Sequence, residues 1–188
     1  MPNPISYSKT PLVLDAISAV KVLHYYGNST RGDIYAYLRA YVCAGDLVFS
    51  LTGFEKTPPE QSRLGAAFQF APGADYLFAE LGPKQATCCA VHPATAGPDK
   101  KGPPVVLPAP ARFGGSDEQG FYWGAELRLP AALLQTQFDT VLCPGSRFTG
   151  NAYKYEVGDA AFGAAFACPQ AKVLPGWQSF GEFVVVDY

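Results

Sequence analysis

The sequence has few charged side chains and no long hydrophobic run. Aspartate, glutamate, lysine and arginine make up 16% of its 188 residues, and the formal net charge is −2. Because the basic residues are scattered along the chain, nucleic acid is not expected as a partner. No apolar stretch approaches the roughly 18 residues of a membrane-spanning helix, so a membrane is not expected either. The sequence leaves the oligomeric state open.

Residues that bind metals or haem are scarce. The chain has two histidines, His24 and His92, and its single methionine is Met1. No histidine or cysteine pair has metal-ligand spacing. Cys88 and Cys89 are adjacent, so in a strand they would face opposite sides. We therefore expect no metal site, no haem and no other cofactor.

Motifs of the common enzyme classes are missing as well. The chain has no Gly-x-Gly-x-x-Gly between a strand and a helix, no Gly-Lys-Ser/Thr phosphate loop and no Gly-x-Ser-x-Gly. A cysteine–histidine dyad, or two carboxylates placed across a glycosidic bond, would need residues that meet only in the folded chain. No catalytic residue is therefore assigned, and an enzyme stays an alternative that the sequence disfavours.

The cysteines do not form a disulfide framework in sequence. Their number is odd and their spacing follows no known scaffold. The N-terminus, Met-Pro-Asn-Pro-Ile-Ser-Tyr-Ser-Lys, lacks the basic start and apolar stretch of a secretory leader. Both features are typical of a cytoplasmic protein, which is the location we expect. All five thiols should then be unpaired, namely Cys43, Cys88, Cys89, Cys143 and Cys168.

Glycine, proline and aromatic residues are what the chain has in quantity. It holds 19 glycines and 17 prolines, and 14% of its residues are aromatic. This balance is typical of strands joined by turns, and the length suits one domain with a full core. A hairpin is predicted over residues 34–54, turning at Ala44-Gly45-Asp46, and a second over residues 65–81. A further strand is predicted over residues 85–91.

Two segments carry weak strand signals. Residues 1–15 contain three prolines and are interpreted as an extended lead-in. Residues 93–119 are rich in glycine, proline and polar residues, and are interpreted as two long loops around a short edge strand at 105–107. Together with the hairpins, this predicts a single all-β domain over residues 1–188.

The C-terminal third has the clearest strand pattern. Glu126 and Arg128 alternate with Leu127 and Leu129, which predicts one wet face and one buried face. Pro130 then starts a turn, with a short helical segment after it. The closing β-branched run Phe-Val-Val-Val is typical of a central strand late in the chain.

Aromatic residues and hydrogen-bonding residues are mixed in this half of the chain. Sugar rings stack their C–H faces on aromatic rings, and their hydroxyls need amide or charged partners. Core packing is the competing interpretation for each aromatic. It is weakest for Trp177, which lies in a Leu-Pro-Gly-Trp turn outside the strands. The residues concerned are Tyr122, Trp123, Arg147, Asn151, Tyr153, Lys154, Tyr155, Phe166, Trp177 and Gln178.

Four segments follow one another in a recognisable order: Ile34-Tyr-Ala-Tyr-Leu-Arg-Ala-Tyr, Trp123-Gly-Ala-Glu-Leu-Arg-Leu-Pro-Ala-Ala-Leu-Leu, Gly150-Asn-Ala-Tyr-Lys and Phe180-Gly-Glu-Phe. As a set they resemble the family 9 carbohydrate-binding modules. The resemblance implies an antiparallel β-sandwich of jelly-roll or immunoglobulin-like topology. For the founding members it also implies binding of sugar ends between stacked aromatics.

The resemblance also implies a location for the site. Phe166 stands where the family has a stacking tryptophan, and Asn151 and Lys154 come from the Gly-Asn-x-Tyr-Lys segment. Trp177 and, in reserve, Tyr153 complete the expected ligand-binding set. The family's acidic loop reads Glu-Gln-Ser-Arg-Leu at 60–64, so most of its charges are missing here.

These observations predict non-catalytic binding of a small saccharide or related polar ligand. A structural or protein-interaction domain without a small ligand is the alternative, and a glycoside-acting enzyme is a third. A pocket with aromatic rings and converging polar groups would favour the first, whereas an exposed flat apolar patch would favour the second. A buried carboxylate or histidine with a shifted pKa in a cleft would favour the third.

Overall fold

The structure is a computed structural model that describes residues 1–27, 34–84, 87–94, 102–167 and 180–187. Within these residues the chain forms one sheet of thirteen strands, one short 3-10 helix and one α-helix. In chain order the elements are β1 (Asn3–Ser8), η1 (Leu14–Ala16), β2 (Val20–Lys21), β3 (His24–Tyr26), β4 (Ala36–Cys43), β5 (Asp46–Gly53), β6 (Ser62–Gln69), β7 (Tyr76–Leu81), β8 (Cys88–His92), β9 (Ala111–Asp117), β10 (Gly120–Leu129), α1 (Ala131–Phe138), β11 (Arg147–Glu156), β12 (Phe162–Ala164) and β13 (Gly181–Asp187).

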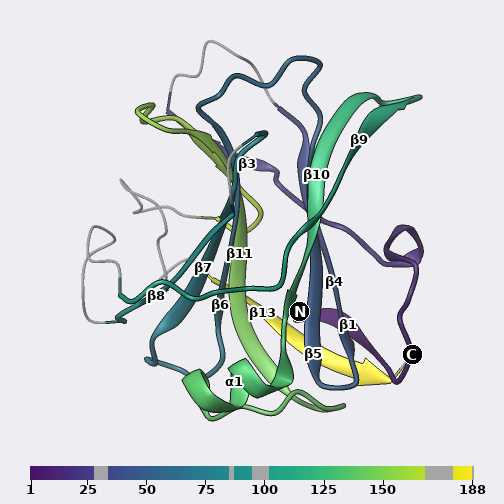
Figure 1. Cartoon of the computed structure of the whole chain (residues 1–188), viewed down its shortest axis with the longest axis vertical. Coiled ribbons are helices and arrows are strands. Elements are labelled where there is room, and N and C mark those ends of the chain that lie inside the picture. The colour runs from purple at the N-terminus through teal and green to yellow at the C-terminus, as the bar shows by residue number, and fades with distance from the viewer. Residues whose placement is uncertain (28–33, 85–86, 95–101, 168–179, 188) are drawn as a thin grey trace.

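The sheet curls into two layers. Its strands are hydrogen-bonded in the order β8-β7-β6-β11-β13-β1-β4-β5-β10-β9, with β12, β3 and β2 off this path. Figure 1 shows β8, β7, β6 and β11 on one side and β4, β5, β10 and β9 on the other, with β13 and β1 joining them below. We call these the first and the second layer. The predicted all-β class is confirmed.

The main core lies between the two layers. Phe49 of β5 meets Phe68 of β6 with ring centroids 5.1 Å apart, and Phe148 of β11 stacks on Phe183 of β13 at 5.3 Å. All four side chains are buried. Burying a phenylalanine contributes about 1.5–3 kcal/mol to stability, so such contacts hold the layers together.

The alternation in β10 confirms the predicted register. Leu127 and Leu129 are 3% and 0% exposed, whereas Glu126 and Arg128 are half-buried on the outer face of the second layer. A period of two leaves no other arrangement once the leucines enter the core. β10 ends at Leu129, and Pro130 is the N-cap of α1, which begins at Ala131, so the short helical segment expected after Pro130 is present.

The two predicted hairpins are confirmed. β4 pairs with β5 along its whole length, and β6 pairs with β7. The first turn places Ala44 at φ 50° and Gly45 at φ 94°, a left-handed pair that lets two adjacent strands reverse in two residues. The strand expected over residues 85–91 is β8, which occupies Cys88–His92.

Two expectations about weak segments need correction. Residues 93–119 were expected to be long loops, but β9 occupies Ala111–Asp117 and pairs with seven residues of β10. No strand forms at residues 105–107, where the described chain makes an isolated bridge through Pro104 instead. All residues of β9 are exposed, so no buried face could leave an alternating pattern in the sequence.

The extended lead-in contains an internal strand. Residues of β1 pair in parallel with β13 on one side and with β4 on the other. Ile5 is the residue of β1 that enters the core, at 2% exposed. One buried side chain in six is too weak a signal to reveal a central strand, and Pro4 argues against one. The sheet is therefore antiparallel except at β1.

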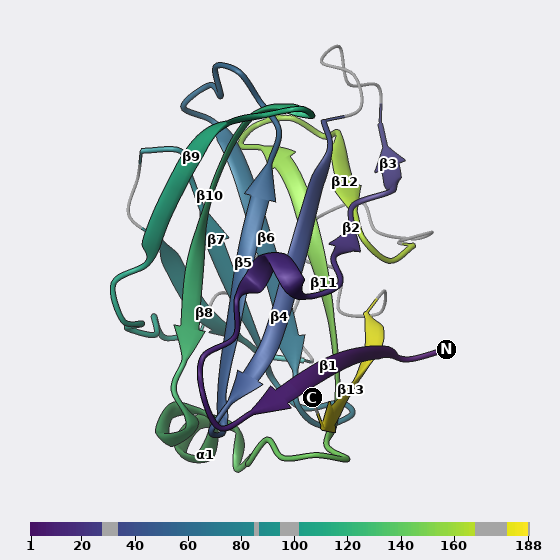
Figure 2. The same cartoon turned by 90° about the vertical axis from the view of Figure 1, so that its right-hand side faces the viewer.

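The segment that follows β1 crosses the outer face of the second layer. Figure 2 shows η1 lying in front of β4 and β5. Under it a small satellite core forms from Ile17, Tyr41, Cys43 and Val48, with Leu12 and Leu14 packed against it. This segment covers one end of the face and leaves the other end open.

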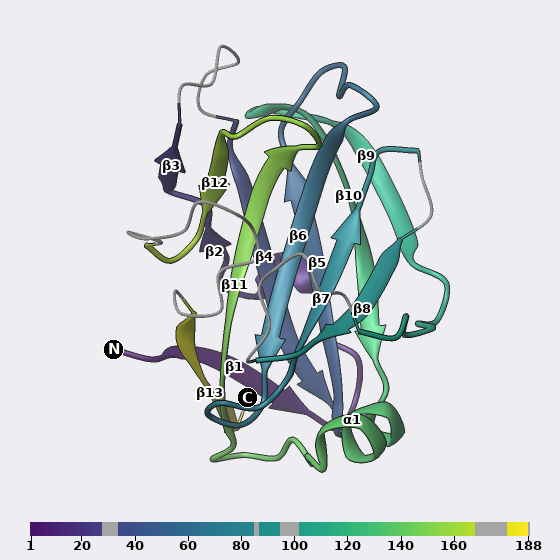
Figure 3. The same ribbon diagram turned by 90° about the vertical axis from the view of Figure 1, so that its left-hand side faces the viewer.

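The outer face of the first layer is covered differently. Figure 3 shows β12 and β3 beside β11 on that side of the molecule. A second small core lies there, formed by Ala67, Tyr76, Phe78, Tyr153, Phe162 and Ala164. The two layers thus share one core between them, and each has a smaller one outside.

Thiols, metals and membranes can be addressed for the described part of the chain. Cys43, Cys88, Cys89 and Cys143 are free there, as predicted, and Cys168 lies outside the described residues. Burial raises the pKa of the Cys89 thiol to about 12. The described residues contain no group of three histidine, cysteine or acidic side chains able to hold a metal ion. They also contain no helix with the length and apolar character of a membrane span.

Candidate functional site

Outward side chains of the second layer line up in three rows across its strands. The first row is polar and ends in alanine: Arg39, Ser50, Glu126 and Ala111. The second row is mixed: Tyr37, Thr52, Gly124 and Phe113. The third row is mainly aromatic: Tyr35, Phe54, Tyr122 and Gly115. Strand pairing alone brings these residues together, since each row takes one residue from each neighbouring strand.

The rings of the second and third rows form a continuous strip. Tyr37 and Phe54 have centroids 6.1 Å apart, Phe54 and Tyr122 are 5.9 Å apart, and Tyr122 and Phe113 are 6.4 Å apart. Tyr35 contacts both Tyr37 and Phe54. The strip therefore offers aromatic faces and edges along the open end of the layer.

Glycines allow the rings at the β9 side to lie close to the sheet. A Cβ on Gly124 would lie 2.7 Å from the Phe113 ring, and a Cβ on Gly115 would lie 3.1 Å from the Tyr122 hydroxyl. The two rings therefore rest where these glycines leave room. Gly115 belongs to the glycine-rich run that hides β9 in the sequence, so the feature that obscures the strand also shapes the site.

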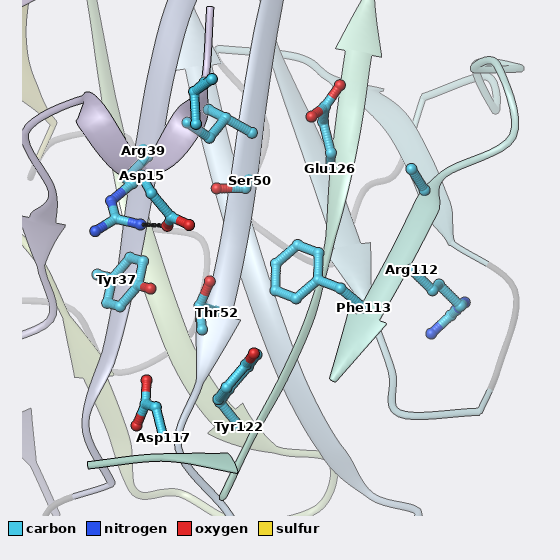
Figure 4. A pocket seen from close by; sticks show the side chains of 13 residues that line it. Asp15, Tyr37, Arg39, Ser50, Thr52, Arg112, Phe113, Asp117, Tyr122 and Glu126 are labelled. Carbon is cyan, nitrogen blue, oxygen red and sulfur yellow. Dashed lines mark hydrogen bonds and ion pairs between the residues drawn. The ribbon is translucent and has the colours of Figure 1, made fainter. Parts of the chain in front are cut away.

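A groove of about 420 Å³ runs over these rows. We call it the outer groove, and Figure 4 looks into it. Residues 13–15, just after β1, line it together with side chains of the second layer. Those side chains are Tyr37, Arg39, Ser50, Thr52, Ala111, Arg112, Phe113, Asp117, Tyr122 and Glu126.

Several polar side chains of the outer groove already have partners within the chain. Arg39 forms an ion pair with Asp15, and its guanidinium lies 4.7 Å from the Tyr37 ring centroid. Arg112 donates to the backbone carbonyls of Gly82 and Pro83 at 2.9 and 3.2 Å. These interactions set where the two guanidinium groups lie, and they leave Arg39 Nε without a hydrogen-bond partner among the described residues.

Other polar side chains of the outer groove have no such partner. Among the described residues, Ser50, Thr52 and Glu126 make no side-chain hydrogen bond and no ion pair. Ser50 and Thr52 are each 3% exposed, and Glu126 is half-buried. All three line the groove, so their polar atoms are directed at its open space and not into the core.

The residues that the sequence predicted for the ligand site lie elsewhere, on β11 and after β12. Asn151 is fully buried, and its Oδ1 accepts hydrogen bonds from the backbone N–H groups of Ala165 and Phe166 at 3.1 and 2.9 Å. Its Nδ2 donates to the Phe166 carbonyl at 3.1 Å. The amide thus fixes the backbone after β12.

Lys154 belongs to a buried polar cluster between the layers. Its Nζ lies 3.4 Å from Oε1 of Glu55, and the two side chains are 4% and 6% exposed. Oε2 of Glu55 accepts hydrogen bonds from Trp123 Nε1 at 3.0 Å and from Ser62 Oγ at 2.7 Å. We call Glu55, Ser62, Trp123 and Lys154 the interior cluster.

The three remaining predicted residues differ in accessibility. Tyr153 is fully buried in the outer core of the first layer, 6.1 Å from Phe78, and faces away from Lys154 as its place on the strand predicted. Phe166 is half-buried and meets Phe183 edge-to-face at 5.7 Å. Trp177 lies outside the described residues. A ligand site at this location stays a prediction.

Sequence reasoning missed the outer groove as a site. The segment Tyr35-Ala-Tyr-Leu-Arg does alternate polar or aromatic residues with apolar ones, which was a usable signal for one strand. The partners on β5, β9 and β10 are distant in sequence. Only strand register brings them into the same rows.

Comparisons with known proteins identify the fold. No family model matches the sequence, and no curated protein is significantly similar to it. A candidate carbohydrate-binding protein from Bacteroides uniformis aligns with a TM-score of 0.70 and 10% identity over 97% of each chain.

Two structures of a family 9 carbohydrate-binding module from Caldicellulosiruptor kristjanssonii also align, each with a TM-score of 0.61. The complex with glucose is 12% identical and covers 100% of this chain and 97% of that one. The complex with cellotriose is 11% identical and covers 100% and 95%. At this identity the likeness establishes the fold rather than the function. The chain therefore has the fold of family 9 carbohydrate-binding modules, as its sequence motifs suggested.

Proposed function

We propose that this protein binds a saccharide without catalysing a reaction on it. The observation that carries the proposal is the outer groove, where an aromatic strip runs beside polar groups that have no partner among the described residues. The solved structures of the same fold with bound glucose and cellotriose support the same ligand class.

The chemistry of the outer groove suits a sugar ring. The C–H face of a pyranose can pack on Tyr122 or Phe113, and its hydroxyls can reach Ser50, Thr52 or Glu126. A volume of about 420 Å³ falls within the range of roughly 300–1,000 Å³ that is usual for small-molecule sites. Apolar and polar surfaces lie side by side, as an amphipathic ligand requires.

The location predicted from the sequence remains a second proposal for the site. It comprises Phe166, Trp177, Asn151, Lys154 and Tyr153. Phe166 is the member best placed to meet a ligand, because the other three described members are buried. Variants of Phe166 and of the outer groove separate the two locations.

The test is a calorimetric titration with a panel of mono- and oligosaccharides. We expect Tyr122→Ala to weaken binding at least about five-fold, since a stacking ring contributes on the order of 1 kcal/mol. The matched control is Phe121→Ala. Phe121 is the neighbouring residue on β10, is 47% exposed, and faces the opposite way from Tyr122. Equal losses in both variants, or loss only in Phe166→Ala, would move the site away from the outer groove.

A protein-interaction domain is the second candidate, favoured by one edge of the sheet. β9 ends the strand order, and all its residues are exposed. The opposite edge, β8, is partly covered, because Gly102 and Val105 donate backbone hydrogen bonds to Val91 and Cys89. An open edge can pair with a strand of a second copy. Sedimentation over a range of concentrations, with Ser116→Pro as the edge-blocking variant, tests this candidate.

A further inference from the structure

The outer groove is lined by more negatively charged side chains than positively charged ones. Two cations, Arg39 and Arg112, line it together with three carboxylates, Asp15, Asp117 and Glu126. Arg39 pairs with Asp15, and Arg112 is directed to two backbone carbonyls. The carboxylates of Asp117 and Glu126 remain, and they differ in their hydrogen-bond partners and in their exposure to water.

The Asp117 carboxylate already accepts hydrogen bonds from the turn between β9 and β10. Its Oδ1 accepts hydrogen bonds from the backbone N–H groups of Gln119 and Gly120 at 2.8 and 3.2 Å. The residue is also exposed, so water solvates the rest of its charge. Glu126 is therefore the carboxylate of the outer groove that has neither a partner nor full solvation.

The neighbours of Glu126 offer it no counter-charge. Its partners in the register are Ser50 on β5 and Ala111 on β9. Arg128 shares its face of β10, but Arg128 Nη1 is bound to Asp46 Oδ2 at 3.2 Å. In Figure 4 the Glu126 side chain stands beside Ser50, while Arg39 and Arg112 point elsewhere.

The charge of Glu126 is felt within the layer. The pKa of Tyr41 is raised, mainly because the phenol is buried; a backbone hydrogen bond at Leu12 lowers it, and the negative charge of Glu126 raises it while the positive charge of Arg128 lowers it. Because Glu126 is half-buried in the groove wall, a cation placed beside it would gain more than it would beside a fully exposed carboxylate.

We propose that Glu126 makes the outer groove selective for saccharides that carry a protonated amino group, such as oligomers of glucosamine. This inference rests on the proposed saccharide-binding function. A neutral sugar that covers the carboxylate removes its hydration water, and hydrogen bonds from sugar hydroxyls offset only part of the lost hydration free energy. An ammonium group offsets more of it, because it forms a charge-assisted hydrogen bond with the carboxylate.

The aromatic strip favours the same ligand class. An ammonium group is attracted to the face of an aromatic ring within about 6 Å. Phe113 lies in the row next to Glu126, and Tyr122 lies in the row beyond it, on the same face of the sheet. An amino sugar could therefore place its charge between a carboxylate and a ring, while its ring C–H groups pack on the strip.

The experiment compares three trimers of similar size by calorimetry: glucosamine trimer, its fully N-acetylated form and cellotriose. Below the pKa of the sugar amine, the wild-type protein should bind the glucosamine trimer at least ten-fold more tightly than either neutral trimer. The preference should shrink as pH rises through the pKa of the amine, and as salt concentration increases.

The Glu126→Gln variant tests the residue. It should lose at least ten-fold in affinity for the glucosamine trimer, and change less than two-fold for cellotriose. Glu182→Gln is the matched control, since Glu182 is an exposed carboxylate on β13 paired with Arg147 outside the outer groove. That variant should leave all three affinities unchanged.

The outcomes separate the inference from the proposed function. Equal binding of the three trimers, or undiminished glucosamine binding by Glu126→Gln, overturns the selectivity and leaves saccharide binding standing. Absence of binding to every saccharide overturns both. If Glu126→Gln does not fold, the ligand series and pH profile of the wild-type protein decide the question alone.

Discussion

The interior cluster and the outer groove contain the same kinds of side chain in opposite situations. Each has a carboxylate, a hydroxyl and aromatic rings close together. In the interior cluster, the Glu55 carboxylate meets Lys154, Trp123 and Ser62. In the outer groove, Glu126 lies opposite Ser50 on the paired strand, yet neither side chain bonds to another described residue.

The difference separates polar groups that are bonded within the fold from polar groups that, in our proposal, bind a saccharide. A buried ion pair contributes little net stability compared with apolar packing, but removing one partner leaves the other charge buried without its counter-ion, which is strongly destabilising. A polar group on the wall of a groove has no such partner, so replacing it should change the stability of the fold little. Stability and binding should therefore respond to substitutions at the two places in opposite ways.

The largest expected effect is at Lys154. Lys154→Met should lower the free energy of unfolding by about 3–5 kcal/mol, because the buried Glu55 carboxylate loses its ion pair with Lys154. Urea denaturation measures it. The control is Arg147→Met, which breaks the exposed pair with Glu182 and should cost about 1 kcal/mol or less. A stable Lys154→Met protein that has lost saccharide binding would instead support the site predicted from the sequence.

Asn151 should come next. Asn151→Ala removes an acceptor of three backbone N–H groups, those of Ala152, Ala165 and Phe166, and a donor to the Phe166 carbonyl, so we expect a loss of about 2–3 kcal/mol. Thermal unfolding monitored by circular dichroism would show it. Affinity for the best saccharide should stay within two-fold of wild type at a temperature where the variant is folded. A large affinity loss with an unchanged melting temperature would contradict the structural role.

Phe166 tests the same contrast with an apolar side chain. Its ring packs against Phe183 and the main core but remains partly exposed, so Phe166→Ala should cost about 2 kcal/mol, less than a fully buried phenylalanine. Saccharide affinity should be retained if the outer groove is the site. Melting and titration of one preparation give both quantities, and a several-fold loss of affinity would return the site to this location.

The smallest change in stability is expected at Thr52. Thr52→Val should alter the free energy of unfolding by less than about 1 kcal/mol, since the hydroxyl has no partner to lose among the described residues. Saccharide affinity should nevertheless fall several-fold. Thr149→Val is the matched control, because that hydroxyl contacts Gln69 outside the outer groove and should leave affinity unaffected. If Thr52→Val is strongly destabilising, the hydroxyl belongs to the fold and the contrast drawn above fails.

Local patterns predicted the strands whose two faces differ in polarity. The alternation at 126–129 placed the leucines inside, and the turn at Ala44-Gly45 located the first hairpin correctly. The same reasoning missed β9, since an exposed strand has no buried face to reveal it. Backbone pairing with β10 stabilises that strand whatever its side chains are.

The candidate site, like the strands, was predicted from the sequence only in part. The sequence showed aromatic and polar residues suited to a saccharide, and its motifs suggested the correct fold. It did not show that Asn151 and Lys154 are buried, because their partners come from distant parts of the chain. A polar side chain has the same local pattern whether it ends in water or in a buried pair.

The sequence by itself determined the all-β class, the main hairpins and the two faces of β10, because a period of two and the chemistry of turns act over a few residues. The tertiary structure decided which polar groups are satisfied, because that depends on which strands become neighbours. Glu55 and Glu126 are both carboxylates at or beside a strand of the second layer. The pairing of the layers buries one with a lysine, and strand register leaves the other open beside the aromatic strip.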